Sequence, residues 1–94
     1  MPVTVGEMKA HLRILHDEED EYIETLIRVA LATAQEYCRV TFDEEAPESV
    51  RLAIMLMVSH YYENREEGDK HVYAAMRMAF ESLLYPHRDV SMMF

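Results

Sequence analysis

The residues with the greatest chemical potential in this chain are its carboxylates, of which there are 18 among 94 residues. Most of them fall in three clusters: DEEDEYIE (17–24), DEEAPE (43–48) and ENREEGD (63–69). Acid–base catalysis by a carboxylate pair requires one carboxyl group to be shielded, so that it holds a proton near neutral pH. Clusters at helix starts and in loops face solvent, where carboxyl pKa values stay low. We therefore interpret the clusters as solvated surface.

The other candidates for catalysis or metal binding are five histidines and one cysteine: His11, His16, Cys38, His60, His71 and His87. His60 precedes Glu63 by three residues, and Glu67 precedes His71 by four. These spacings match neither the HExxH motif nor the repeated Glu-x-x-His of di-iron bundles. We interpret the histidines as boundary residues near helix ends and Cys38 as a buried, small apolar residue. We predict no metal, no cofactor and no catalytic residues.

The elements that carry these residues are predicted to be helices. Thr4 and Glu7 form a capping box for a first helix, which we expect to run to about Ile14 or Leu15. Asp17 is the predicted N-cap of a second helix. Its core positions recur at helical spacing: Ile23, Leu26, Ile27, Ala30, Leu31, Ala34, Tyr37 and Cys38.

A third helix is predicted to begin near Pro47 and is apolar on two sides. One side carries Val50, Ile54, Met57, Val58 and Tyr61, and the opposite side carries Leu52, Met55, Leu56, Ser59 and Tyr62. A helix of this kind is buried between two layers. We expect one layer to be the second helix, and the other to be the fourth helix, the first helix or another copy of the protein. Gly68 is expected to close this helix.

A fourth helix is predicted from the core stripe of Val72, Met76, Ala79, Phe80 and Leu83. Pro86 ends this helix, and residues 86–94 form a C-terminal tail. The predicted fold is all-α, a single domain (1–94) that forms a small bundle of about four helices with a central apolar third helix.

Composition limits the function classes. The net charge is −9, and the nine basic residues are scattered and form no cluster along the sequence. Direct binding to DNA or RNA is therefore not expected. The apolar run from Leu52 to Val58 is far shorter than the roughly 20 residues of a membrane span, and no secretory signal is recognised. A single cysteine suits a reducing compartment. We expect a soluble cytoplasmic protein.

The chain carries more apolar surface than a small core needs. Met78 and Tyr85, with Ala74, form a second stripe on the fourth helix, and the sequence SMMF (91–94) ends the chain. Methionine is common at adaptable binding surfaces, and exposed apolar stripes mark interfaces. We expect contacts with another chain at Met55, Tyr62, Ala74, Met78, Tyr85, Arg88, Met92, Met93 and Phe94.

Five segments follow one another from about Val3 to Arg88: VTVGEMKAHLRI, DEEDEYIETLIRVA, EYC, PESVRLAIMLMVSHYYENRE and LLYPHR. As an ordered set, they resemble the head–tail connector (adaptor) proteins of long-tailed double-stranded-DNA phages and prophages. The resemblance implies a small helical subunit of a ring, typically dodecameric, in the virion at the head–tail junction, after assembly in the bacterial host cytoplasm. The ring would join the portal protein to head-completion or tail proteins and let DNA pass through its bore without specific binding. In relatives the C-terminal segment reaches into the portal.

Two alternatives remain open on the residues themselves. A small acidic regulatory or antitoxin-like protein would use its acidic surface to mimic DNA or to mask a basic partner, and would form a dimer or a one-to-one complex. A metal or hydrolytic enzyme would require His60, Glu63 and His71 to converge inward. Under the connector hypothesis, we expect added salt to favour assembly, because it screens the repulsion between acidic subunits.

Overall fold

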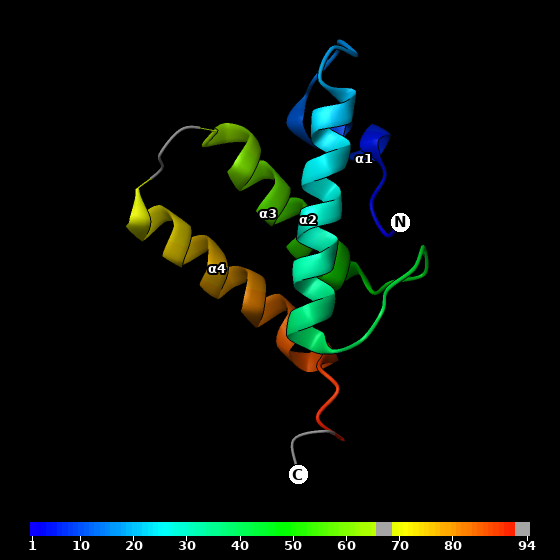
Figure 1. Ribbon diagram of the computed structural model, residues 1–94, viewed down its shortest axis with the longest axis vertical. Coiled ribbons are helices and arrows are strands. Elements are labelled where there is room, and N and C mark those ends of the chain that lie inside the picture. Colours follow the sequence, from blue (N-terminus) through cyan, green and yellow to red (C-terminus); the bar gives the residue numbers. More distant parts are fainter. Residues whose placement is uncertain (66–68, 92–94) are drawn as a thin grey trace.

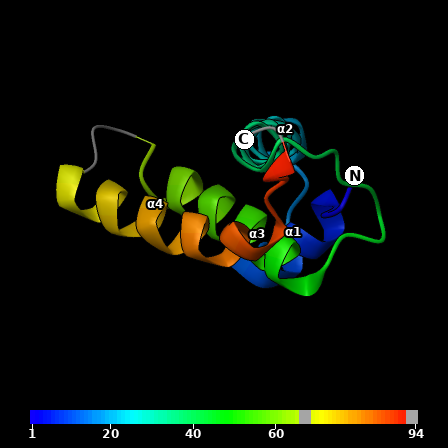
Figure 2. The ribbon, with the colours of Figure 1, turned by 90° about the horizontal axis from the view of Figure 1, so that it is seen from below.

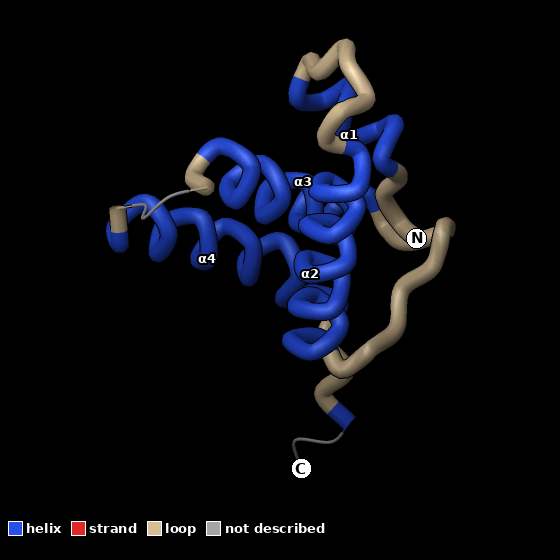
Figure 3. The backbone as a smooth tube through the Cα atoms, turned by 45° about the horizontal axis from the view of Figure 1, so that its top comes forward, coloured by secondary structure: helices blue, strands red, loops and turns tan. Residues whose placement is uncertain are grey.

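The computed structural model describes residues 1–65 and 69–91, and the elements found there are four α-helices and one short 3₁₀ helix. The α-helices are α1 (Val5–Leu12), α2 (Asp20–Cys38), α3 (Glu48–Glu63) and α4 (Lys70–Leu84), and the 3₁₀ helix η1 spans Tyr85–His87. The predicted all-α fold is confirmed. Figure 3 shows that the connection from α2 to α3, residues 39–47, runs around the outside of the molecule.

The helices form two layers. α3 and α4 lie side by side as an antiparallel hairpin, and α2 crosses one face of this hairpin (Figure 1). Seen along α2, the hairpin extends well to one side of it (Figure 2). The molecule is accordingly flat, with principal extents of 47 × 31 × 17 Å. Among the described elements, α2 makes the main contacts with the hairpin, and α1 packs mainly on α2.

The core lies where α2 crosses the hairpin. Its largest fully buried side chains include Phe80 from α4, Ile27 from α2 and Ile54 and Met57 from α3. The predicted core stripe of α2 is confirmed at six of its eight positions, while Leu31 and Tyr37 are only partly buried. Apolar side chains from three helices that leave water together are the main source of stability in a domain of this size.

The first helix is shorter than predicted. The capping box is confirmed, because Glu7 N–H donates to Thr4 Oγ1 and Thr4 N–H donates to Glu7 Oε1, both over 3.1 Å. The helix ends at Leu12, however, rather than at Ile14 or Leu15. Arg13 adopts the left-handed conformation (φ 60°), which turns the chain and leaves Leu15 99% exposed.

The N-cap of the second helix was also predicted wrongly. α2 begins at Asp20 with Glu19 as the N-cap, two residues later than expected. Asp17 does not cap the helix, because its carboxylate binds the ammonium group of Lys9 on α1. The ion pair ties α1 to the start of α2.

Two positions predicted for the core of α4 lie at the surface. Val72 and Ala79 are exposed, and Leu84 is fully buried instead, so the buried stripe runs through Met76, Phe80 and Leu84 at i, i+4 and i+8. For Val72 the cause is the position of α2, which crosses the hairpin near the end of α4 and not near its start (Figure 1). The third helix ends at Glu63 with Asn64 as its C-cap, and the predicted helix-closing Gly68 lies outside the described residues.

Candidate assembly surfaces

The apolar stripe predicted on α4 is at the surface. Ala74 is exposed, and Met78 and Tyr85 are 71% and 66% exposed. We call these three residues the outer α4 surface. At 100° per residue they lie on the side of the helix away from Phe80, so the core of this chain does not reach them. Side chains of this size, exposed together, are typical of contact surfaces.

A groove adjoins the outer α4 surface where α4 passes the end of α2. It has a volume of about 280 Å³ and is lined by Tyr37, Met78, Glu81, Ser82 and Tyr85. We call it the Tyr37 groove. Tyr37 is partly buried and forms its α2 wall, so two aromatic rings, those of Tyr37 and Tyr85, line this groove together with Met78.

A second groove lies between the N-terminal half of α3 and the end of α4. It has a volume of about 260 Å³ and is lined by Glu48, Ser49, Arg51, Leu52, Met55 and Leu83. We call it the Leu52 groove. Leu52 is 51% exposed, and Met55 and Leu83 are partly buried. The side of α3 that the sequence predicted to face a second layer therefore remains open to solvent at Leu52.

Tyr62 is held within its own chain. Its hydroxyl donates to Glu19 Oε1 over 2.8 Å, across from α3 to the start of α2. Arg65 binds the same carboxylate, and its guanidinium lies over the rings of Tyr62 and Tyr22, at 4.5 and 4.7 Å from their centroids. The bond from Tyr62, followed by the one from Arg65, lowers the pKa of Glu19, and the carboxylate in turn raises the pKa of Tyr62. The cluster joins α2 to the end of α3.

Arg88 is also engaged inside the chain. Its Nε donates to the carbonyl oxygen of Tyr37 over 3.2 Å, and its guanidinium lies 4.8 Å from the centroid of the Tyr37 ring. The next residue, Asp89, donates its backbone N–H to the carbonyl oxygen of Cys38 over 2.8 Å. The remaining predicted contact residues, Met92, Met93 and Phe94, lie outside the described residues.

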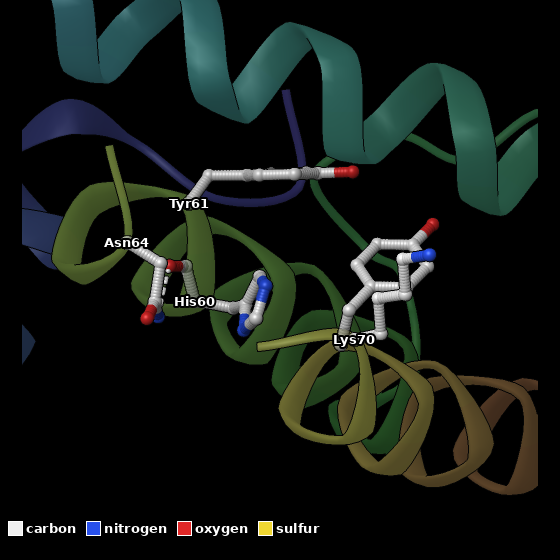
Figure 4. Close-up of a pocket in the computed structure, with 5 residues that line it drawn as sticks. His60, Tyr61, Asn64 and Lys70 are labelled. Atoms are coloured by element: carbon white, nitrogen blue, oxygen red, sulfur yellow. Dashed lines mark hydrogen bonds between the residues drawn. The ribbon is translucent and has the colours of Figure 1, made fainter. Parts of the chain in front are cut away.

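The histidine that the sequence singled out at the end of α3 borders a third cavity, of about 300 Å³ (Figure 4). It is lined by His60, Tyr61, Asn64, Lys70 and Tyr73, which come from the end of α3 and the start of α4. The His60 ring makes edge contacts with both tyrosines, at centroid distances of 5.6 and 5.7 Å. Burial raises the pKa of the Tyr61 hydroxyl, with a further contribution from Tyr73.

The residues of the enzyme alternative do not gather around this cavity. Glu63 and His71 are exposed, and neither lines it. Within residues 1–65 and 69–91, no three His, Cys, Asp or Glu side chains stand close enough together to hold a metal ion. An enzyme needs an acid, a base and a positioned nucleophile in mutual contact. Around His60, the described residues Glu63 and His71 do not supply this arrangement.

Cys38 lies in the core, as predicted from its place on α2. Its side chain is fully buried, and its thiol donates to the carbonyl oxygen of Leu84 over 3.6 Å. Burial raises the pKa of the thiol. Because the reactive form of cysteine is the thiolate, this residue is held in its unreactive state.

Two features were not predicted from the sequence: the Leu52 groove and the cluster of Glu19, Tyr22, Tyr62 and Arg65, which we call the Arg65 cluster. Arg65 stands three residues after Tyr62, a helical spacing that brings two side chains together, and this signal was readable in YYENRE. The groove had no such signal. Leu83 was assigned to the core, and only the crossing of the helices decides that it borders a groove with Leu52 and Met55.

In a comparison with protein families, the model of the phage gp6-like head-tail connector protein family matches residues 2–88. Searches of curated proteins and of solved structures each return no match to this chain. The family match covers all four α-helices and η1. Among the described helices, none is both long enough and apolar enough to cross a membrane.

Proposed function

The chain belongs to the phage gp6-like head-tail connector family, and we propose that it is the repeating subunit of a ring that joins the portal to head-completion or tail proteins. Membership in the family makes it a structural connector of the virion that assembles with other phage head and tail proteins. The family membership therefore favours a connector function over the acidic regulatory or antitoxin-like function that the sequence left open. The ring, the portal contact and the passage of DNA are the proposed part.

The observation that supports a ring is the presence of two different apolar surfaces on one subunit. A ring is built from heterologous contacts, in which one surface of a subunit meets a different surface of its neighbour. The outer α4 surface presents Met78 and Tyr85 as projecting side chains. The Leu52 groove is a hollow with an apolar floor. We propose that the first inserts into the second on the neighbouring subunit.

The charge of the chain suits a channel for DNA. Each subunit carries a net charge of −9, and a ring multiplies that charge around its bore. Tight binding of DNA requires clustered cations that replace counterions on the phosphates. An acidic wall repels the phosphates, so the duplex can slide without being held.

The pairing of the two surfaces is tested by one charged substitution on each. Met78→Glu places a carboxylate on the outer α4 surface, and Leu52→Glu places one in the groove. Because both positions are exposed, each variant is expected to fold, which circular dichroism checks. At concentrations where the wild type forms rings in electron micrographs, each variant alone is expected to be monomeric by sedimentation.

The decisive sample is an equal mixture of the two variants. A Met78→Glu subunit keeps its groove and a Leu52→Glu subunit keeps its outer α4 surface, so the mixture has one intact junction and is expected to form dimers only. Val29→Glu, at an exposed apolar position on α2, is the matched control and should still form rings. A mixture that stays monomeric would show that these two surfaces are not partners.

The repulsion between acidic subunits is tested separately, by sedimentation of the wild type at increasing salt concentration. Assembly that weakens as salt is added would contradict the role of charge repulsion.

A further inference from the structure

The beginning of the C-terminal segment is fixed against the end of α2. Arg88 and Asp89 donate to the carbonyl oxygens of Tyr37 and Cys38, two of the last four residues of the helix. These carbonyls have no partner within a helix and require one from outside. On the other side of the segment, His87 Nε2 and Ser49 Oγ share a hydrogen bond of 2.6 Å. The chain therefore leaves the fold from a defined place.

That place is the edge of the Tyr37 groove. Tyr37 contributes to both: its ring lies under the Arg88 guanidinium and also lines the groove. Tyr85, which begins η1, lines the groove from the other side. An apolar segment that follows Arg88 closely in the sequence therefore starts next to exposed apolar side chains.

The end of the chain has the length and the composition to occupy this groove. After Ser91 it continues with Met92, Met93 and Phe94, and three residues span at most about 10 Å. Methionine adapts to irregular gaps and makes favourable contacts between its sulfur and aromatic rings. The groove offers Tyr37 and Tyr85 as such rings.

We propose that, in the unassembled subunit, Met92, Met93 and Phe94 bind the Tyr37 groove of their own chain and cover Met78. The intramolecular site is favoured over a second copy because a short tether gives an effective concentration in the millimolar range. This inference rests on the proposed function, since the groove overlaps the outer α4 surface. The tail then regulates that surface: a neighbouring subunit has to displace it.

The test follows the methionine methyl groups by nuclear magnetic resonance in the full-length protein. The variant Met92→Ser/Met93→Ser/Phe94→Ser keeps the chain length and removes the apolar side chains. We expect the Met78 methyl resonance to shift between the wild type and this variant, equally at low and high protein concentration. The Met55 resonance, from the Leu52 groove, is the matched control and should not shift.

Each other result overturns the proposal. An unchanged Met78 resonance would show that the tail does not bind this groove. A shift seen only at concentrations where sedimentation detects oligomers would assign the groove to the tail of a neighbour. A shift of Met55 instead would place the tail in the other groove. None of these readings depends on ring formation, so they separate this inference from the proposed function.

The effect on assembly gives a second readout. If the tail covers the groove for nine-tenths of the time, the variant without the apolar tail should assemble at about tenfold lower concentration than the wild type. Sedimentation across a dilution series measures this shift. Equal or weaker assembly of the variant contradicts the regulatory part of the proposal.

Discussion

The start of α2 and the end of α4 differ in whether their side chains find partners within the chain. At the start of α2, charged residues from three elements are paired within the chain: Lys9 with Asp17 and Asp20, and Arg65 with Glu19. At the end of α4, Met78 and Tyr85 remain mostly exposed. These charged side chains thus find partners within the chain, whereas Met78 and Tyr85 do not, which is the arrangement expected of a subunit made to meet neighbours.

The largest expected effect sharpens this contrast within one helix. Phe80 is fully buried on α4, two residues after Met78. Phe80→Ala is expected to lower the free energy of unfolding by about 3–5 kcal/mol, because it removes buried surface and leaves a cavity. Met78→Ala, made in the variant with the serine-substituted tail so that no tail contact covers Met78, should change it by no more than about 0.5 kcal/mol. Urea denaturation at low, monomeric protein concentration measures both values.

The result that would break the contrast is a large loss of stability from Met78→Ala in this serine-substituted background, because it would mean that the fold itself covers Met78. A larger loss in the wild-type background than in the serine-substituted background would measure the cover that the tail provides.

The second expected effect concerns the N-terminal end, where the polar groups of the backbone are satisfied locally. Thr4→Ala removes the hydroxyl that accepts the Glu7 N–H and is expected to cost about 1 kcal/mol of unfolding free energy. Thr4→Ser keeps this acceptor and is the matched control. Thermal and urea unfolding should rank the wild type and the serine variant together, above the alanine variant. Equal stability of all three would show that α1 contributes little to the fold.

The smallest expected effect is a dependence of the unfolding free energy on pH, which arises from carboxyl groups at the start of α2. The bonds from Tyr62 and Arg65 lower the pKa of Glu19 in the folded protein, and the bond from Lys9 lowers that of Asp17. A carboxyl group of this kind stabilises the fold above its unfolded-state pKa, about 4.3 for glutamate. That contribution is lost as the pH falls through the folded-state pKa.

Unfolding measured between pH 6 and pH 3 should therefore show stability falling with acid, and Glu19→Gln should flatten part of the slope. The glutamine can still accept the hydrogen bond from Tyr62, so the variant isolates the charge. Because these pairs are largely solvent-screened, the change is expected to be small. An unaltered slope in Glu19→Gln would show that the Arg65 cluster is not electrostatically coupled to folding.

Local patterns predicted much of the fold. The capping box of Thr4 and Glu7 involves neighbours in sequence, and the stripe from Ile23 to Cys38 repeats at the period of a helix, so both were readable without tertiary contacts. The end of the first helix was misplaced, because Leu15 continues the apolar pattern while Arg13 turns the chain. Asp17 was misplaced as a cap because Lys9, eight residues earlier in the chain, takes its carboxylate.

The candidate surfaces were predictable only in part. The exposure of Met78 and Tyr85 was predictable, because helical spacing places both residues on the side of α4 away from its core stripe. The sequence did not predict that Tyr62 and Arg88, both expected contact residues, form hydrogen bonds within their own chain. Their partners Glu19 and Tyr37 are 43 and 51 residues away in the sequence. Pairings over such separations depend on how helices cross.

By itself, the sequence determined the number and type of elements, the acidic character of the surface and the family, since these follow from local propensity, charge count and ordered motifs. Only the tertiary structure decided which apolar residues remain exposed. α2 crosses one end of the α3–α4 hairpin, and that placement buries Leu84 while leaving Val72 and Leu52 in water. Helical period assigns side chains to faces, but whether a face is covered depends on the element packed against it.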